Sequence, residues 1–419
     1  MQNYKSYNEI VLVTNFIIIL ISIYGMYLGD KYNYSLNKIF YLFVFFFFGI
    51  SPAIEFSLNV KYWNGSKINE IEYIWMNIII IIILLFYIYF YNFFYKIKDL
   101  KIEKSIVYFF SKKLKSRIKV TFILVFISFV SLLILLFFNK FSLYSLLLRG
   151  GEGVETIKVE KMTWLLIGQF IKPLPIACLI IFKIKKIKKI FVEVVLLGIV
   201  LLTNFPTSSA RFYVAAVYIP LLLLYISFYK KKLILNQSLI IGMLFLFPLL
   251  DEMRSFSGIE NLKFGFKFEM FLEGHFDSYQ NFLRVVSNDI VTNGKQLQTS
   301  ILFFVPRKLW SGKSIGSGAY VANELGLGFD NISMNYFGEG YINFGYMGII
   351  IFTILLAFIN SRFDKVYWEK LGQTNILKGI YLLSLGMLFF ILRGDLLSSF
   401  AYTTGILFTV VFIYKLIIK

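Results

Sequence analysis

The chain is 419 residues long, and 58% of these residues are hydrophobic, with a mean hydropathy of +0.72. This is more apolar surface than a soluble core can bury, so the composition excludes a soluble globular protein and predicts a polytopic membrane protein. The net charge of +19 comes mostly from lysines in short loops between apolar stretches, which suits anionic lipid headgroups and does not imply a nucleic-acid partner. The single cysteine, Cys178, excludes an internal disulfide and a cysteine-rich metal site.

Apolar stretches that are long enough to cross a membrane follow one another along most of the chain. About 20 apolar residues cover the hydrocarbon core of a bilayer, so the sequence predicts an all-α protein with about eleven transmembrane helices. These expected spans are residues 10–28, 39–58, 71–95, 118–138, 162–182, 190–204, 211–229, 233–250, 346–360, 376–392 and 399–417. The predicted domains are a bundle of about eight helices at 1–250, a large external loop at 251–346, and about three helices at 347–419.

The lysines predict which way the chain is oriented, because positive residues are retained on the cytoplasmic side of a membrane. Lys and Arg are concentrated in alternate short loops: nine at 96–119, five at 183–189, three at 230–232 and four at 361–378. These loops are therefore expected in the cytoplasm and the 251–346 loop on the external face. The C-terminus is then inside and, with an odd number of spans, the N-terminus is outside.

Two local patterns predict the surroundings of particular apolar residues. The phenylalanine run Phe45–Phe48 suits contact with lipid. Apolar residues at helical spacing from Glu269 to Val286 predict an amphipathic helix across the mouth of a site in the external loop.

Four arginines lie where expected spans meet the external face, and a guanidinium there can hold an anion with little competition from water. They are Arg211, Arg254, Arg307 and Arg393. The fixed fork of guanidinium donors matches phosphate oxygens, which a lysine does not reproduce. The alternative is that each arginine snorkels or pairs with a nearby acid. Within the spans, Lys172 beside Pro173 suits a groove for a lipid phosphate, and Glu55 could line it, although a simple ion pair explains either residue equally well.

Short segments of the chain resemble the membrane polymerases that join lipid-linked oligosaccharide repeat units, of the O-antigen and capsule type. The segments that carry the resemblance are Pro306–Lys313, Gly338–Gly348, Ser209–Arg211 and Leu392–Asp395. Ser314 departs from the family's pattern, in which a proline commonly follows the lysine. The resemblance implies a multi-pass protein of the bacterial cytoplasmic membrane, with a GT-C-like arrangement and a catalytic loop on the external face.

The resemblance also implies a reaction. A glycan carried on undecaprenyl diphosphate would be transferred to a hydroxyl of the next lipid-linked repeat unit, with release of undecaprenyl diphosphate. The four arginines above would then bind the departing diphosphate, whose growing charge needs stabilisation. The chain contains no Asp-x-Asp pair, so neither a metal nor another cofactor is expected.

Three residues are candidates for the base that takes the proton from the acceptor hydroxyl. They are His275, whose side-chain type titrates near neutrality, Glu339, which is flanked by two glycines, and Asp277. The roles of the three could also be shared. Trp310 and Tyr341 are the candidates for contact with sugar, although aromatic residues of such a loop also pack it and anchor it at the membrane interface.

Two other functions remain open at this point. An O-antigen ligase-like transferase would use the same donor and a different acceptor, and a flippase would move the lipid-linked oligosaccharide without chemistry. A flippase is expected to place its charges along a central cavity, whereas here they gather at the external boundary. The expected partners are undecaprenyl-diphosphate-linked oligosaccharides, membrane lipids and a chain-length regulator.

Overall fold

The computed structural model describes residues 2–148, 154, 156–157, 161–252, 265–372 and 374–419. The described residues form helices joined by turns and contain no β-strand, apart from one isolated bridge between Leu114 and Ile418. They divide into two compact units. The first unit comprises residues 1–97, 267–364 and 388–401, and the second comprises residues 98–266, 365–387 and 402–419.

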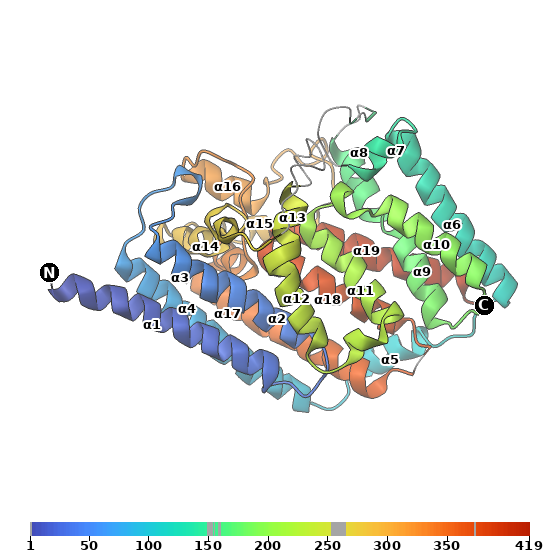
Figure 1. Ribbon diagram of the computed structural model, residues 1–419, viewed down its shortest axis with the longest axis horizontal. Helices are drawn as coiled ribbons and strands as arrows, with labels where there is room; N and C mark the ends of the chain where they lie inside the picture. The colour runs from blue at the N-terminus through green and yellow to red at the C-terminus, as the bar shows by residue number, and fades with distance from the viewer. Residues whose placement is uncertain (1, 149–153, 155, 158–160, 253–264, 373) are drawn as a thin grey trace. The chain divides into compact units, whose positions relative to one another are not determined.

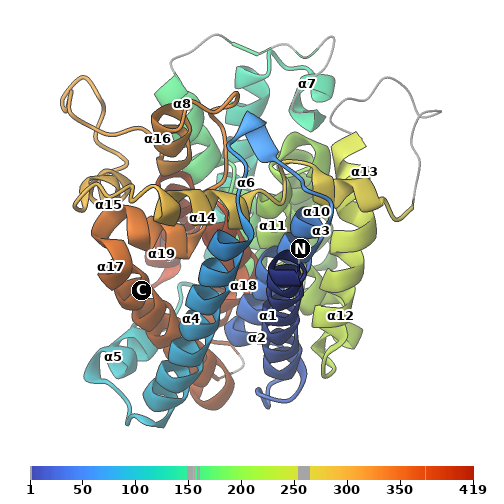
Figure 2. The ribbon, with the colours of Figure 1, turned by 90° about the vertical axis from the view of Figure 1, so that its left-hand side faces the viewer.

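The first unit is built on long apolar helices that lie alongside one another (Figure 1). Its helices are α1 (Gln2–Tyr27), α2 (Leu36–Val44), α3 (Ser51–Ser57), α4 (Glu70–Lys96), α14 (Ser278–Ser287), α15 (Lys295–Ile301), α16 (Ser317–Glu324) and nearly all of α17 (Tyr336–Lys365). A π-helical turn at Phe45–Ile50 joins α2 to α3. The short helices α14 and α16 gather at the end of the unit where α3 ends and α4 begins (Figure 2).

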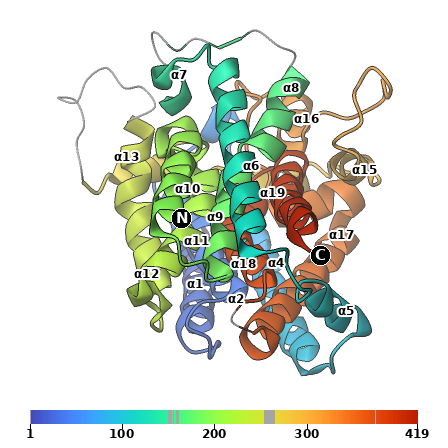
Figure 3. The ribbon, with the colours of Figure 1, turned by 90° about the vertical axis from the view of Figure 1, so that its right-hand side faces the viewer.

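The second unit contains the middle of the chain, and its helices α6, α9 and α10 pack on one another (Figure 3). Its helices are α5 (Lys101–Phe109), α6 (Arg117–Phe138), α7 (Leu143–Leu147), α8 (Lys161–Leu166), α9 (Leu174–Ile184), α10 (Ile190–Thr203), α11 (Arg211–Tyr225), α12 (Ile234–Ile241) and α13 (Phe247–Glu252). Helices α18 (Leu377–Arg393) and α19 (Leu396–Ile417) contribute residues to both units.

Eight helices of the described residues are long and apolar enough to cross a membrane. They are Asn8–Tyr27, Leu36–Ser57, Glu70–Lys96, Arg117–Phe138, Thr163–Ile184, Ile190–Ser208, Tyr336–Lys370 and Leu396–Ile417. The predicted all-helical, multi-pass class is therefore confirmed, whereas the number eleven and the GT-C-like arrangement are not. The expected spans 211–229, 233–250 and 376–392 correspond to shorter helices, of which α11 ends at Tyr225 and contains Pro220. The predicted division at 250/251 and 346/347 concerns membrane sidedness and stays a prediction.

The phenylalanine run of the second span lies inside the first unit and not toward lipid. Phe46, Phe47 and Phe48 are at most 1% exposed. Phe47 stacks on Phe276 with ring centroids 5.0 Å apart, and Phe48 lies 6.1 Å from Phe337. Aromatic rings bury a large apolar area, so this cluster fastens the predicted external segment to the helix bundle. The expectation of lipid contact was wrong because Phe276 and Phe337, which cover these rings, are more than 200 positions away in the sequence.

The predicted amphipathic helix at 269–286 is also shorter than expected. Its first residues form a 3₁₀ turn at Phe268–Leu272, and α14 begins only at Ser278, after the N-cap residue Asp277. Every residue of α14 from Ser278 to Val285 is buried. The helix is therefore a core element of the unit and does not lie across an opening.

Helix α17 carries a carboxylate near each end, and each carboxylate accepts a backbone N–H from the start of another helix. Glu339 Oε1 accepts from Leu396 N of α19 at 2.7 Å. Asp364 Oδ1 accepts from Leu36 N of α2 at 2.9 Å. The first N–H groups of a helix have no partner within the helix, and the N-terminus favours negative charge, so both contacts are stabilising.

Between these two carboxylates α17 bends sharply. Phe344 and Gly345 leave the helical conformation, and Gly345 has a φ of +60°, which favours glycine. The bend brings Gly340 and Gly348 together: a Cβ atom added to Gly340 would lie 2.8 Å from the carbonyl oxygen of Gly348. Gly340 and Gly348 are therefore explained by close approach of the backbone, and Gly345 by its positive φ.

We expect Gly348→Ala to lower the free energy of unfolding by about 1–3 kcal/mol, because the added methyl group would overlap the carbonyl of Gly340. The matched control is Gly198→Ala in α10, where no atom beyond the adjoining backbone of the same helix lies within 4 Å of the added carbon. Thermal unfolding of the two purified variants in one detergent measures the difference. Equal midpoints for the two variants would contradict the close contact.

Candidate functional site

The candidate site lies in the first unit, where the loop 58–69 meets the segment 267–333. The indole Nε1 of Trp63 donates to Asp277 Oδ2 at 2.8 Å. The carbonyl oxygen of Trp63 accepts from Gly328 N at 3.0 Å. One residue of a short loop thus holds two distant parts of the predicted external segment.

A buried arginine completes the contact between this loop and α14. Arg284 is 2% exposed, and its Nη2 lies 3.2 Å from both the carbonyl oxygen of Tyr62 and Oε1 of Gln280. Burial lowers the pKa of Arg284 below its ordinary value. A side chain at Gly65 would overlap this guanidinium. Arg284 therefore fixes the loop in place and is not available to a ligand.

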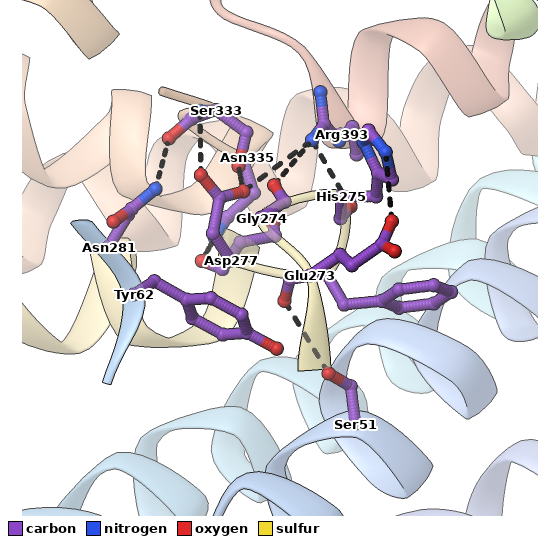
Figure 4. A network of polar contacts seen from close by, with 12 residues as sticks. Ser51, Tyr62, Glu273, Gly274, His275, Asp277, Asn281, Ser333, Asn335 and Arg393 are labelled. Atoms are coloured by element: carbon purple, nitrogen blue, oxygen red, sulfur yellow. Dashed lines mark hydrogen bonds and ion pairs between the residues drawn. The ribbon is translucent and has the colours of Figure 1, made fainter. Parts of the chain in front are cut away.

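Asp277 is the centre of a buried polar network (Figure 4). Its side chain is fully buried and accepts from the hydroxyl of Ser333, from Ser333 N at 3.2 Å and from Trp63. Arg393 Nη2 lies 3.5 Å from Asp277 Oδ1. A carboxylate that is removed from water needs such donors, because an unpaired buried charge is costly.

Arg393 is the last residue of α18, and this predicted diphosphate-binding arginine meets a predicted base. Besides Asp277, its Nη2 contacts the carbonyl oxygens of Gly274 at 3.3 Å and His275 at 3.1 Å (Figure 4). Its side chain keeps 19% of its surface exposed. The guanidinium is thus oriented by the turn 274–277 and still reaches the surface.

His275 is the most accessible of the three predicted bases. Its side chain is 28% exposed, and Nε2 lies 3.4 Å from Glu273 Oε2. The structure brings His275, Asp277 and Arg393 together around one turn. A guanidinium, a buried carboxylate and an imidazole therefore lie around this turn, and of these the guanidinium and the imidazole reach the surface.

Glu339 lies apart from that turn and is fully enclosed. Its side chain has no exposed surface, and its two oxygens accept from Ser317 Oγ at 2.8 Å and from Leu396 N at 2.7 Å. Neighbouring Asp395 caps the same helix by accepting from Ser398 N at 2.8 Å, and burial raises the pKa of Asp395 above its ordinary value. The contacts of Glu339 join α16, α17 and α19, and its catalytic role stays a prediction.

The Pro306–Lys313 segment forms a loop that is closed by its own cations. Arg307 is exposed, and it donates from Nη1 to the carbonyl of Lys313 at 2.5 Å and from Nη2 to the carbonyl of Ser314 at 2.7 Å. Lys313 donates to three carbonyls that follow α15, namely Leu302 at 3.3 Å, Phe303 at 2.7 Å and Val305 at 2.8 Å. Burial and the charge of Arg307 lower the pKa of Lys313. These donors satisfy backbone carbonyls that would otherwise lack a partner.

The two other predicted arginines are located differently. Arg254 lies outside the described residues. Arg211 belongs to the second unit, where it is the first residue of α11. In that unit Lys172 Nζ donates to Ser209 Oγ at 2.8 Å and lies 3.2 Å from the carbonyl of Ser208. The short polar turn before α11 is therefore beside a lysine. Whether the four arginines bind one diphosphate stays a prediction.

The predicted sugar-binding residues have contrasting surroundings. Trp310 is half-buried in the cation-closed loop. Tyr341 is 2% exposed, and its hydroxyl donates to Asp289 Oδ1 at 2.8 Å. Trp310 is the more accessible of the two to a ligand.

The loop 58–69 and the serine that pairs with Asp277 were not predicted from the sequence. No local sequence pattern marks Trp63 or Ser333, because each acts through a hydrogen bond to Asp277, which is more than 50 positions away. Two signals were present: a tryptophan between Tyr62 and Asn64 in a short loop, and Asp277 two positions after His275.

Residues 317–419 match the sequence model of the family described as O-antigen polysaccharide polymerase Wzy. The predicted resemblance to this family is confirmed. The matched part contains the Gly338–Gly348 and Leu392–Asp395 segments, and therefore Glu339, Tyr341 and Arg393. The Pro306–Lys313 and Ser209–Arg211 segments lie before it. No curated protein and no solved structure matches the chain.

The Wzy-like match covers the helices that hold Arg393, while its partner Asp277 lies outside the matched residues.

We expect Asp277→Ala to lower the free energy of unfolding by about 3–5 kcal/mol, because Arg393 and Trp63 lose a buried acceptor. Denaturant unfolding of the purified protein measures this loss. The control is Asp330→Ala at an exposed position, with an expected change of about 0.5 kcal/mol or less. Similar losses for both variants would contradict the network.

Lys313→Ala should open the loop after α15, because three carbonyls lose their common donor. We expect faster cleavage by chymotrypsin after Leu309 and Trp310, measured on the purified protein by mass spectrometry. Lys308→Ala, which removes an exposed lysine of the same loop, is the matched control. Unchanged cleavage of Lys313→Ala would show that the loop is held by other contacts.

Proposed function

We propose that this chain polymerises undecaprenyl-diphosphate-linked oligosaccharide repeat units on the outer face of the cytoplasmic membrane. The observation that carries the proposal is the Wzy match at residues 317–419, together with eight membrane-crossing candidates within the part of the chain that the structure describes. The Wzy match supports O-antigen repeat-unit polymerisation in general. The lipid carrier, the outer face and the residue roles are the finer part of the proposal.

The reaction replaces one bond at the anomeric carbon of the growing glycan. The acceptor hydroxyl oxygen forms a new bond to this carbon, the bond from the carbon to the diphosphate oxygen breaks, and undecaprenyl diphosphate leaves with the bonding electrons. The hydroxyl proton passes to a base. The leaving diphosphate gains negative charge, which preorganised cations stabilise.

The turn 274–277 supplies groups suited to both demands. His275 is the accessible base candidate, and Arg393 is held beside it by two backbone carbonyls and Asp277. We assign proton transfer to His275 and diphosphate binding to Arg393 together with Arg211, Arg254 and Arg307. Asp277 orients Arg393. That the reaction proceeds without a metal stays part of the proposal.

The alternatives differ in their products. A ligase-like transferase would transfer the same glycan to an acceptor other than a lipid-linked repeat unit, and a flippase would form no glycosidic bond. Both are distinguished by incubating the purified protein with the lipid-linked repeat unit that accumulates in cells lacking this chain. Growth of the glycan by whole repeat units supports polymerisation, and no growth contradicts it.

The arginine assignment predicts a specific defect. Arg211→Ala, Arg254→Ala, Arg307→Ala and Arg393→Ala should each lower polymer formation on the order of a hundredfold and leave single repeat units on the lipid carrier. Lysine at these positions should restore little, because it lacks the bidentate fork. Gel ladders of surface glycan at matched expression measure the effect.

Two controls separate charge removal from loss of structure. Arg117→Ala removes an exposed arginine from the predicted cytoplasmic end of α6 and should leave a full ladder. Lys313→Ala loosens the loop that holds Arg307 without removing its guanidinium. Normal ladders from the combined Arg211, Arg254 and Arg307 alanine variant would reject diphosphate binding by these side chains.

A further inference from the structure

Helix α5 of the second unit lies at the level where several membrane-crossing candidates begin or end. It belongs to the short connection between the candidates α4 and α6. The hydroxyl of Tyr414 donates to the carbonyl of Phe109, the last residue of α5, at 2.7 Å. Lys115 N donates to the carbonyl of Ile417, the last residue of α19, at 2.8 Å. Because a membrane-crossing helix ends at the bilayer boundary, these contacts place α5 at that boundary.

The beginning of α5 is held by the last residue of another candidate, Tyr336–Lys370. Lys370 Nζ lies 2.5 Å from Asp99 Oδ1 and 3.1 Å from Glu103 Oε2. Asp99 and Glu103 are the acidic residues of the connection 96–119, which also carries nine Lys and Arg. Both carboxylates are therefore engaged within the protein, and the connection keeps a large excess of positive charge.

The nine residues of α5 form three different faces, because successive residues of an α-helix lie about 100° apart. The first face packs on the protein and contains Glu103, which is 9% exposed. The second is an exposed apolar stripe, in which Ile102 and Ile106 are 64% and 41% exposed. The third contains Lys101 and Lys104, which are both exposed. Residues four or three positions apart lie on one side of a helix, so each pair is a continuous feature.

The combination of stripe, charge and location indicates the partner of this surface. Amphipathic helices that lie in the plane of a membrane interface have an apolar side and a lysine-rich polar side. A basic segment next to a membrane-crossing helix is attracted to anionic lipid headgroups. A nucleic acid would also attract the lysines, but it would leave Ile102 and Ile106 in water. An anionic bilayer surface accounts for both the charge and the apolar stripe.

We propose that α5 is an in-plane membrane anchor that binds anionic phospholipid. Ile102 and Ile106 enter the boundary between the headgroups and the acyl chains. The headgroup phosphates contact the exposed lysines of α5 and of the turn that follows it. These lysines are Lys101, Lys104, Lys112 and Lys113. The lipid belongs to the leaflet that the lysine distribution predicts to be cytoplasmic. The anchor contains none of the residues assigned to polymerisation, and it is independent of the proposed function.

Fluorescence quenching tests whether the apolar stripe enters the bilayer. The full-length protein with Ile106→Cys, labelled with the fluorophore NBD, is reconstituted into nanodiscs of phosphatidylglycerol. Wild-type protein, whose Cys178 is fully buried, gives the background of labelling. The matched control is Ser105→Cys, an exposed neighbour that points about 100° away around the helix.

A nitroxide on the acyl chain near the headgroup should quench the probe at residue 106 at least severalfold more strongly than the probe at residue 105. Iodide in the water should quench the two probes in the opposite order. Equal quenching of both probes by the nitroxide contradicts the anchor. Protection of the residue 106 probe from both quenchers would show that protein covers the stripe, and it also contradicts the anchor.

Lipid binding tests the role of the lysines. The purified full-length protein is titrated with phosphatidylglycerol or phosphatidylcholine, and the bound lipid is measured by native mass spectrometry. The combined variant Lys101→Gln, Lys104→Gln, Lys112→Gln and Lys113→Gln should bind phosphatidylglycerol about tenfold more weakly or worse, because each lysine near the surface adds to the attraction. Binding of phosphatidylcholine should not change, since this lipid has no net charge.

The matched control removes the same charge from other exposed loops that are also predicted to be cytoplasmic. It combines Lys188→Gln, Lys189→Gln, Lys231→Gln and Lys232→Gln. This control should retain most of the affinity for phosphatidylglycerol. Equal losses in the two variants would show an effect of net charge alone and contradict a binding surface at α5. Unchanged affinity of the α5 variant would contradict it as well.

Discussion

The buried carboxylate of Asp277 is the constraint on which the first unit depends. A charge removed from water must be surrounded by donors, and the donors to Asp277 come from three places in the chain: Trp63 in the loop 58–69, Ser333 before α17, and Arg393 at the end of α18. The contacts of these donors with the carboxylate hold the ends of the helices together. The positions of His275 and of the Arg393 guanidinium follow from it.

The sequence alone was sufficient for the features that depend on composition along the chain. Eight of the expected spans correspond to helices long and apolar enough to cross a membrane, because twenty consecutive apolar residues leave few alternatives. The family resemblance was also readable, since the Gly338–Gly348 segment and the Leu392–Asp395 segment lie within the matched residues. The three shorter helices were overestimated, because an apolar stretch alone does not indicate where a helix ends.

The features that were missed depend on contacts between distant residues. The apolar run that contains Phe47 predicted contact with lipid, whereas the ring of Phe47 stacks on Phe276. No local pattern predicted that Trp63 donates to Asp277. The candidate site shows the same limit. The residue types suited to phosphate were evident from the sequence, but their surroundings differ: Arg307 donates to carbonyls of its own loop, whereas Arg393 contacts a carboxylate and two carbonyls of a distant turn. One sequence does not show which donor groups of a side chain already form hydrogen bonds within the protein.

Helix α17 has a further consequence for how this protein can vary. Glu339 and Asp364 face the first turns of α19 and α2, and the helix is continuous from the bend at Phe344 and Gly345 to Asp364. Each added or deleted residue turns the rest of an α-helix by about 100°. A single insertion in the interval between the bend and Asp364 would swing this carboxylate away from α2 while Glu339, which lies before the bend, stayed engaged. Length change among natural variants should consequently fall in the loops, and this interval should keep a constant number of residues.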